Sequence, residues 1–196
     1  MKNSVVAWDL DETLGSWVQL GLVSDCIQDR LGRQLGKEEL FSLIDLFPEY
    51  VRPGVVPLLE TLKSQIKSGV QTKVILFTNN NGPRSWAKNI VSYFNRRVGF
   101  SLFSEIIPAF EVNGKQVSKC RTSPGKLYSD LLACIDHPRG TKVCFIDDQE
   151  HPGMRNTHVR YLKIAPYSVS LSPRVIGRRL LGFSVQGQYM LSLIHI

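Results

Sequence analysis

The chain has 196 residues, which favours one domain or one domain with a small insertion, and its 43% apolar and 21% charged residues are ordinary for a soluble globular protein. No apolar run approaches the ~18 residues of a membrane span, and the first residues lack the pattern of a signal peptide. The net charge is +7, and the charged residues are unevenly distributed, because residues 151–196 contain no Asp or Glu. This region is either a basic surface for anionic partners or a solvated helix face.

The predicted elements begin with a strand over residues 4–8, which is buried because apolar side chains occupy both of its faces. Residues 16–50 are expected to form a small helical insert, with helices near 22–34 and 37–46. A helix over residues 55–66 follows, with apolar side chains at helical spacing.

The middle of the chain continues the alternation of strands and helices. A second buried strand covers residues 73–78, and Pro83 begins the next helix. Residues 105–120 are expected to form a hairpin insert that turns at Asn113-Gly114. Ser123-Pro124 has the pattern of a helix cap followed by a first-turn proline.

Two further strands are predicted, a buried one over residues 142–147 and one over 159–164 whose alternating pattern places it nearer an edge. Strands that alternate with helices imply an α/β fold with a parallel, Rossmann-like sheet flanked by helices. We predict one such domain over residues 1–165, with small inserts and no large covering domain. Residues 166–196 form a basic extension, whose apolar end indicates an incomplete or altered C-terminus.

Neither the cysteines nor the histidines form a metal-binding pattern. The four cysteines contain no C-x-x-C pair, so we predict four reduced thiols in a cytoplasmic or nuclear protein. They are Cys26, Cys120, Cys134 and Cys144. The four histidines have no metal-ligand spacing and are predicted to be structural or surface residues. They are His137, His151, His158 and His195.

Polar side chains gather where three predicted strands end. These side chains are Asp9 and Asp11, Thr78 and Asn79, and Asp147 and Asp148. Functional groups of parallel sheets meet at the carboxyl edge, so we expect a single site. Close carboxylates repel one another, and Mg²⁺, which prefers oxygen ligands, relieves that repulsion. One carboxylate can then attack phosphorus, while another protonates the leaving oxygen and activates water.

The run Asp9-Leu10-Asp11-Glu12-Thr13-Leu14 resembles the D-x-D-x-T motif of the haloacid dehalogenase superfamily. It is similar to the D-L-D-E-T-L form of the carboxy-terminal-domain (small) phosphatases, also described as the NLI-interacting-factor-like branch. Arg52-Pro53-Gly54 and Ile75-Leu76-Phe77-Thr78 are similar to that branch as well. The resemblance spans residues 4 to 152, although Asp147-Asp148-Gln149-Glu150 differs from the Asp-Asn-Ser-Pro of the branch.

The resemblance implies a role for each strand-end residue. Asp9 would be the nucleophile and Asp11 the general acid and base. Thr78 would hold a phosphoryl oxygen, with Asn79 as a further donor to the substrate. The resemblance also implies an Mg²⁺ site formed by Asp9, Asp11 (through its backbone carbonyl), Asp147 and Asp148.

The resemblance also implies a catalytic lysine that neutralises the phosphoryl charge, as phosphoryl transfer requires. We choose Lys126, because it is expected to open a helix that leads into the 142–147 strand. Lys119 and Lys142 are the alternatives, and Lys142 begins its strand and should therefore point from the wrong edge.

We therefore predict a magnesium-dependent phosphomonoester hydrolase that acts through an aspartyl-phosphate. A phosphoprotein is the favoured substrate, because small inserts leave the site open, and we expect a monomer that does not bind membranes. A phosphorylated nucleic-acid end, bound with help from the basic C-terminal region, and a small metabolite are alternatives. A receiver-type phospho-acceptor domain and a binding module without catalysis are the competing classes.

Overall fold

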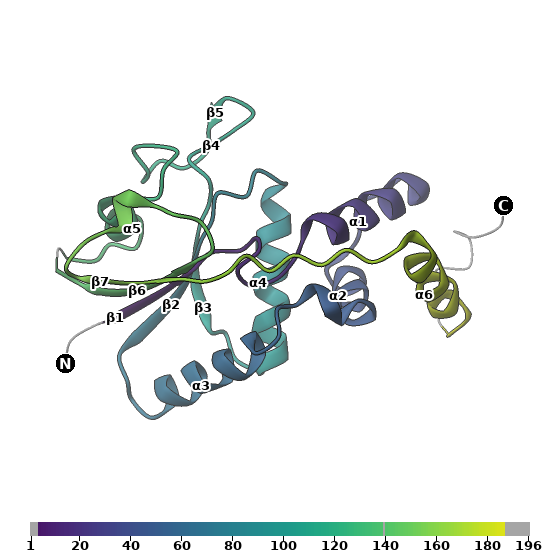
Figure 1. Cartoon of the computed structure of the whole chain (residues 1–196), viewed down its shortest axis with the longest axis horizontal. Helices are drawn as coiled ribbons and strands as arrows, with labels where there is room; N and C mark the ends of the chain where they lie inside the picture. The colour runs from purple at the N-terminus through teal and green to yellow at the C-terminus, as the bar shows by residue number, and fades with distance from the viewer. Residues whose placement is uncertain (1–3, 139, 187–196) are drawn as a thin grey trace. The chain divides into compact units, whose positions relative to one another are not determined.

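The computed structural model describes residues 4–138 and 140–186 and contains a five-stranded sheet in the order β3-β2-β1-β6-β7 (Figure 1). The chain divides into two compact units. The sheet unit comprises Met1–Gly15 and Arg52–Tyr167, and the helical unit comprises Ser16–Val51 and Ser168–Ile196. No helix within the described ranges is both long and apolar enough to cross a membrane.

All neighbouring strands of the large sheet are parallel. The strands are β1 (Ser4–Trp8), β2 (Thr72–Phe77), β3 (Phe103–Ile107), β6 (Lys142–Asp147) and β7 (Val159–Lys163). The sheet is flanked by α3 (Val55–Lys67), α4 (Arg84–Val98) and α5 (Tyr128–Cys134). The predicted α/β class with a parallel sheet and flanking helices is therefore confirmed.

The register of β1 with its two neighbours determines which residues lie together at the carboxyl edge. Trp8, the last residue of β1, pairs with Leu76 of β2 and with Ile146 of β6. One residue further along each strand come Asp9, Phe77 and Asp147. The ends of β1, β2 and β6 therefore lie level with one another, and the polar residues that follow them converge.

The apolar core explains why the central strands were recognisable in the sequence. Fully buried side chains on one face of the sheet pack against α5, and they include those of Val5, Ala7, Ile75, Phe77 and Phe145. Strands β1, β2 and β6 are shielded on both faces, which requires apolar residues at successive positions. The alternating strand β7 lies at an edge, as predicted.

The other edge strand, β3, was not predicted, and its residues overlap the segment assigned to a hairpin insert. Only its end residues Phe103 and Ile107 are buried, and Ser104 is exposed, so the sequence lacks a continuous apolar run. The hairpin itself is shorter than expected. It consists of β4 (Glu111–Val112) and β5 (Lys115–Gln116), which turn at Asn113 and Gly114 with positive φ angles of 52° and 71°.

The helix after Ser123-Pro124 also begins later than predicted. Leu127 caps α5 with an extended backbone (φ −117°, ψ 142°), so the helix starts at Tyr128. Lys126 consequently lies in the turn before α5 and not in its first turn.

The helices over Val55–Lys67 and Arg84–Val98 begin close to their predicted positions. The first helix spans Val18–Leu31 and so begins four residues before its predicted start. The helix over Pro173–Gln186 was not predicted.

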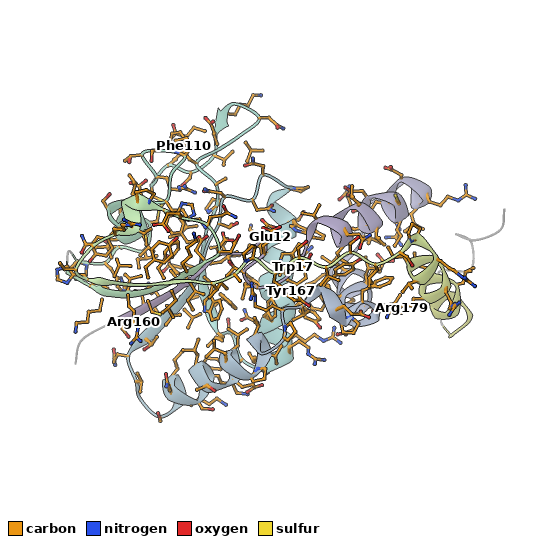
Figure 2. The ribbon with its side chains drawn as sticks, in the orientation of Figure 1. Glu12, Trp17, Phe110, Arg160, Tyr167 and Arg179 are labelled. Atoms are coloured by element: carbon orange, nitrogen blue, oxygen red, sulfur yellow. A yellow bond between two sulfur atoms is a disulfide. The ribbon has the colours of Figure 1, made fainter. Side chains whose placement is uncertain are left out.

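The helical unit contains α1 (Val18–Leu31), α2 (Lys37–Leu46), the short helix η1 (Pro48–Tyr50) and α6 (Pro173–Gln186). The basic helix α6 is tied to η1, because Arg179 (labelled in Figure 2) donates to Glu49 Oε2 at 2.8 Å. The side chain of Gln19 on α1 donates to Leu171 O at 2.9 Å. The predicted alteration of the C-terminus concerns residues 191–196, which lie outside the described residues.

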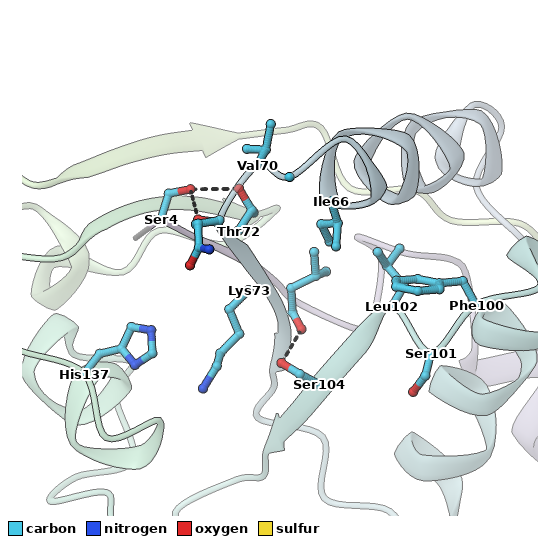
Figure 3. A pocket seen from close by; sticks show the side chains of 13 residues that line it. Ser4, Ile66, Val70, Thr72, Lys73, Phe100, Ser101, Leu102, Ser104 and His137 are labelled. Carbon is cyan, nitrogen blue, oxygen red and sulfur yellow. Dashed lines mark hydrogen bonds between the residues drawn. The ribbon is translucent and has the colours of Figure 1, made fainter. Parts of the chain in front are cut away.

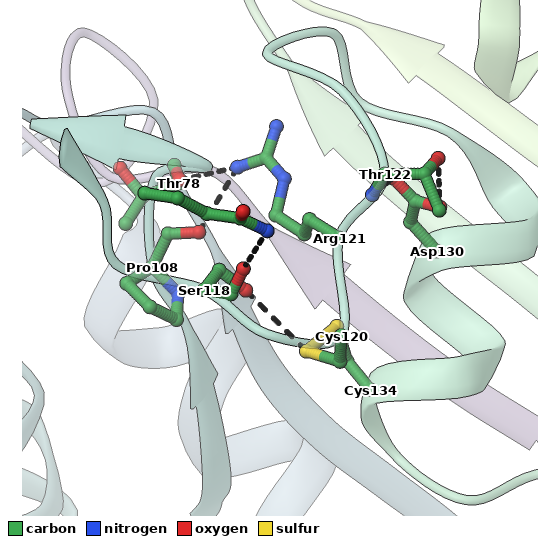
Figure 4. The surroundings of a disulfide bond; sticks show 9 residues. Thr78, Pro108, Ser118, Cys120, Arg121, Thr122, Asp130 and Cys134 are labelled. Carbon is green, nitrogen blue, oxygen red and sulfur yellow. Dashed lines mark hydrogen bonds between the residues drawn. A yellow bond between two sulfur atoms is a disulfide. The ribbon is translucent and has the colours of Figure 1, made fainter. Parts of the chain in front are cut away.

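The prediction of four reduced thiols is wrong for Cys120 and Cys134, which form a disulfide (Figure 4). A spacing of 14 residues gives no sign of this pairing. The two Cα atoms lie 5.0 Å apart because the chain turns back through α5, which ends at Cys134. Cys26 and Cys144 are free. The disulfide removes the cysteine-based argument for a reducing compartment.

We expect the Cys134→Ser variant to be less stable by about 3 kcal/mol, because opening a loop of this length restores entropy to the unfolded chain. Denaturant unfolding under oxidising conditions would measure the loss. Dithiothreitol should lower the wild-type midpoint to that of the variant. The exposed Cys26 supplies the control, since Cys26→Ser should leave the midpoint unchanged. Equal midpoints for wild-type protein and Cys134→Ser would show that the bond contributes nothing.

Candidate active site

The site lies at the carboxyl edge of the sheet, where hydrogen bonds continue one residue beyond the strands. The amide of Asp9 donates to Ile146 O at 2.9 Å, and the amide of Thr78 donates to Ile107 O at 3.0 Å. Asp9, Thr78 and Asp147 are therefore held by the sheet itself, and all three are buried. Their side chains have little freedom to reorganise.

Three buried carboxylates form the centre of the site. Asp9, Asp147 and Asp148 each offer an oxygen, and these three oxygens lie within 4.8 Å of one another. They come from the ends of two neighbouring strands, β1 and β6. Asp9 of the early acidic pair thus meets both acids of the late pair, whereas the side chain of Asp11 is not part of this cluster.

Lys126 lies between two of these acids. Its Nζ donates to Asp9 Oδ1 at 2.5 Å and to Asp147 Oδ2 at 2.7 Å, and its side chain is 1% exposed. Lys119 and Lys142, the alternative lysines, are exposed. Of the three lysines considered, the structure brings Lys126 into contact with the acids.

The surroundings shift the pKa values of the acids in different directions. Burial raises the pKa of Asp9 to about 6, and the nearby Lys126 only partly opposes this shift. Burial also raises the pKa of Asp11. Burial would raise the pKa of Asp147 too, but hydrogen bonds from His151 and Lys126 hold that pKa below its usual value. The site therefore carries one strongly stabilised carboxylate beside one that is costly to ionise.

Asp148 is fixed by Thr13 from the first motif. Thr13 Oγ1 donates to Asp148 Oδ1 at 3.0 Å and accepts from the Asp148 amide at 3.1 Å. The side chain of Gln149 donates to the other carboxylate oxygen at 2.6 Å. Thr13 therefore joins the loop after β1 to the acidic pair at the end of β6.

Asp11 is oriented by an asparagine that the sequence did not single out. Asn80 Nδ2 donates to Asp11 Oδ2 at 2.8 Å, and the Asn80 amide donates to Thr78 Oγ1 at 3.0 Å. Asn79, the predicted donor, is exposed. Alternate residues of an extended chain face the same side. The two-residue spacing between Thr78 and Asn80 was therefore the signal that could have identified Asn80.

His151 is a second residue that the sequence reasoning missed. It was predicted to be structural or at the surface, yet its Nε2 lies 3.2 Å from Asp147 Oδ2, and its side chain is only 14% exposed. The four-residue spacing from Asp147 was a weak signal for this contact. Arg121, which is 1% exposed and contacts the backbone around Thr78, had no sequence signal at all.

The chemistry of the acidic cluster fits a hard divalent cation. All three donors are carboxylate oxygens, the ligands that Mg²⁺ prefers. The three carboxylates lie in a buried site where Lys126 contacts two of them, and burial, with a smaller contribution from the charge of Asp147, raises the pKa of Asp9. Asp9, Asp147 and Asp148 are the side chains that could hold the ion.

A cavity of about 490 Å³ lies at the opposite, amino edge of the sheet, near Ser4 and Thr72 (Figure 3). Its charged side chain Lys73 is paired with Glu105 at 2.6 Å. Within the described ranges, the only group of three or more potential metal ligands is the one at the carboxyl edge. The carboxyl edge is therefore the candidate active site.

No protein-family model matches the chain, and no curated protein matches it. Among solved structures, the chain is similar to a haloacid dehalogenase-like family hydrolase from Xanthomonas campestris, with a TM-score of 0.39 and 12% sequence identity. The similarity covers 95% of this chain and 97% of that chain. Similarity at this level establishes neither a family nor an activity. The class defined by the structure is thus an α/β protein with an acidic site at the carboxyl edge of a parallel sheet.

Proposed function

We propose that the protein is a magnesium-dependent phosphomonoester hydrolase of the haloacid dehalogenase type, with Asp9 as nucleophile. The observation that carries the proposal is the cluster of Asp9, Asp147 and Asp148, with Lys126 Nζ between the first two acids. Buried acids that converge on one point beside a single cation suit the binding of a metal ion and a phosphoryl group together. The first-motif resemblance assigns the same residues to the same chemistry.

In the first step, a carboxylate oxygen of Asp9 attacks phosphorus and the bond to the leaving oxygen breaks. Asp11, held by Asn80 at 2.8 Å, donates its proton to that leaving oxygen. In the second step, Asp11 accepts a proton from water as the water attacks the aspartyl-phosphate. The bond between phosphorus and Asp9 then breaks, which releases phosphate and restores the carboxylate.

Charge stabilisation is divided among the remaining residues. Lys126 and Thr78 would bind the phosphoryl oxygens, and Asp147 and Asp148 would complete the metal site with Asp9 and the backbone carbonyl of Asp11. When bound, Mg²⁺ supplies positive charge that stabilises the phosphoryl oxygens in the transition state.

A phosphoprotein is the substrate that we favour. The insert after β3 contributes only the two-residue strands β4 and β5, which leaves little chain there to enclose a small molecule. Two arginines of the basic C-terminal region are paired with acids, Arg179 with Glu49 and Arg155 with Glu150. This pairing reduces the charge available for nucleic acid, so we rank phosphorylated oligonucleotides below phosphopeptides.

The proposal is tested by phosphate release from p-nitrophenyl phosphate, phosphopeptides, phosphorylated oligonucleotides and sugar phosphates. We expect turnover that stops on addition of EDTA and returns with excess Mg²⁺. Faster turnover of phosphopeptides would support the substrate class. Absence of turnover with every substrate in the presence of Mg²⁺ would contradict the enzymatic proposal.

Metal binding can be tested separately from turnover. We expect Mg²⁺ at 100 times its Kd to stabilise the wild-type protein by about 2.7 kcal/mol, because it binds only the folded acidic cluster. Asp148→Asn should lose most of this increment. Asp136→Asn is the matched control, since Asp136 is exposed in the same unit. Calorimetric titration with Mg²⁺ and thermal unfolding would measure both effects, and equal stabilisation of Asp148→Asn would place the metal elsewhere.

A further inference from the structure

Arg121 is the largest buried cation that the proposed reaction does not use. Its guanidinium donates four hydrogen bonds, all to backbone carbonyls. Figure 4 shows the two that end on Thr78 and Pro108. Nη1 donates to Thr78 O at 3.3 Å and to Pro108 O at 3.0 Å. Nη2 donates to Pro124 O at 2.8 Å and to Gly125 O at 3.1 Å.

These carbonyls belong to separate segments that the candidate site requires. Thr78 follows β2, and Pro108 follows β3. Pro124 and Gly125 lie in the turn immediately before Lys126, which is not part of a helix. One guanidinium therefore joins the end of β2, where a phosphoryl oxygen would bind, to the turn that carries the lysine. The two terminal nitrogens of an arginine fork can donate to separate segments at once, whereas a lysine ammonium donates from a single nitrogen.

The lysine turn is also closely packed against Gly153. A Cβ atom added to Gly153 would lie 2.8 Å from Lys126 O and 2.2 Å from a side-chain carbon of Leu127. The turn is thus packed against Gly153 and hydrogen-bonded to Arg121. Its position fixes where Lys126 Nζ meets Asp9.

Asp130 interacts electrostatically with Arg121, while the hydrogen bonds of the guanidinium go to backbone carbonyls. Asp130 is buried, but its carboxylate accepts from the amide and hydroxyl of Thr122, both at 2.9 Å (Figure 4). The guanidinium also lies over the ring of Phe77, with its carbon 5.0 Å from the ring centroid. Burial of a cation is costly unless hydrogen bonds compensate. Backbone carbonyls provide them for Nη1 and Nη2, whereas the buried Nε has no hydrogen-bond partner. The arrangement therefore holds the backbone of both segments in place.

We propose that Arg121 is a positioning residue, which fixes the Lys126 turn against the end of β2 so that Lys126 and Thr78 bind the same phosphoryl group. The role rests on the proposed phosphatase function. It acts through backbone geometry, so retaining the positive charge at position 121 is not sufficient.

The Arg121→Lys variant separates geometry from charge. We expect kcat to fall by about 10- to 100-fold, since small misplacements of catalytic groups have effects of that size. KM for p-nitrophenyl phosphate should change by less than about threefold, because the charge remains and uniform binding is retained. Arg155→Lys is the matched control, since Arg155 is 71% exposed and paired with Glu150. Its kinetics should equal those of wild-type protein.

Circular dichroism and thermal unfolding establish that the variants are folded at the assay temperature. A folded Arg121→Lys protein with wild-type kcat would overturn the positioning role, even if its melting temperature were lower. Absence of turnover by the wild-type protein would instead contradict the phosphatase proposal, and the positioning role would fall with it.

If Arg121→Lys does not fold, nitrogen NMR of arginine-labelled wild-type protein decides the question. Four carbonyl contacts should restrain rotation of the Arg121 guanidinium, which gives separate signals for Nη1 and Nη2. A single averaged signal would contradict the proposed arrangement.

Discussion

The Asp9→Asn variant is expected to release phosphate at least ~10⁴-fold more slowly than the wild-type protein, a loss typical of removing a nucleophile. An amide oxygen in place of the carboxylate is a poor nucleophile and cannot form the aspartyl-phosphate. Lys126 would keep its contact with Asp147 at 2.7 Å, so the surrounding site should persist. Initial rates with p-nitrophenyl phosphate and Mg²⁺ would measure the loss.

The same substitution should not weaken the fold in the absence of Mg²⁺. The pKa of Asp9 is raised to about 6 by burial, whereas an unfolded Asp titrates near 3.8. The folded state therefore binds this proton more tightly, and stability falls as the pH rises from about 4 to 6. At neutral pH the ionised Asp9 opposes folding, so Asp9→Asn should melt at the same temperature as wild-type protein or higher.

Loss of activity by Asp9→Asn without loss of stability is the result that would identify Asp9 as the nucleophile. Asp136→Asn, an exposed replacement in the same unit, should change neither quantity. Mass spectrometry of acid-quenched wild-type protein should detect a phosphoryl adduct on the peptide that contains Asp9, and the variant should show none. Full turnover by folded Asp9→Asn would exclude Asp9 as the nucleophile.

Strand-end acids were predictable because the strands that carry them are buried on both faces. Such strands read as continuous apolar runs, so the residues that end them, such as Asp9 and Asp147, stand out in the sequence. Parallel pairing then forces those ends to one edge. The edge strand β3 did not stand out, since only part of its surface is buried and its pattern includes Ser104 and Glu105.

Contacts that depend on loops could not be predicted in the same way. Lys126 was chosen for its expected place in a helix, but it reaches Asp9 from a turn before the helix. The Cys120–Cys134 disulfide and the four carbonyl contacts of Arg121 depend on how the chain from β3 to α5 folds back on itself. No periodic pattern in the sequence predicts how this segment folds back. The hydrogen bonds of Arg121 end on backbone carbonyls, which every residue possesses, so no residue type marks their positions.

The Lys126→Met variant tests how much the positive charge of Lys126 contributes to turnover. We expect kcat to fall by about 10²- to 10³-fold, as when a single preorganised donor to the transition state is lost. Breaking a buried charge pair also costs about 3–5 kcal/mol, so rates should be compared at a temperature where thermal unfolding shows the variant to be folded. Lys119→Met is the matched control, because Lys119 is exposed on the same stretch of chain.

Magnesium affinity distinguishes the lysine from the metal-binding acids. Removing Lys126 takes away a cation that competes for Asp9 and Asp147, so Lys126→Met should bind Mg²⁺ at least as tightly as wild-type protein while losing turnover. Asp148→Asn should instead lose Mg²⁺ affinity together with turnover. Calorimetric titration of both variants would measure the difference. Weaker Mg²⁺ binding by folded Lys126→Met, with turnover retained, would mean that this lysine supports the metal site and does not stabilise the phosphoryl group.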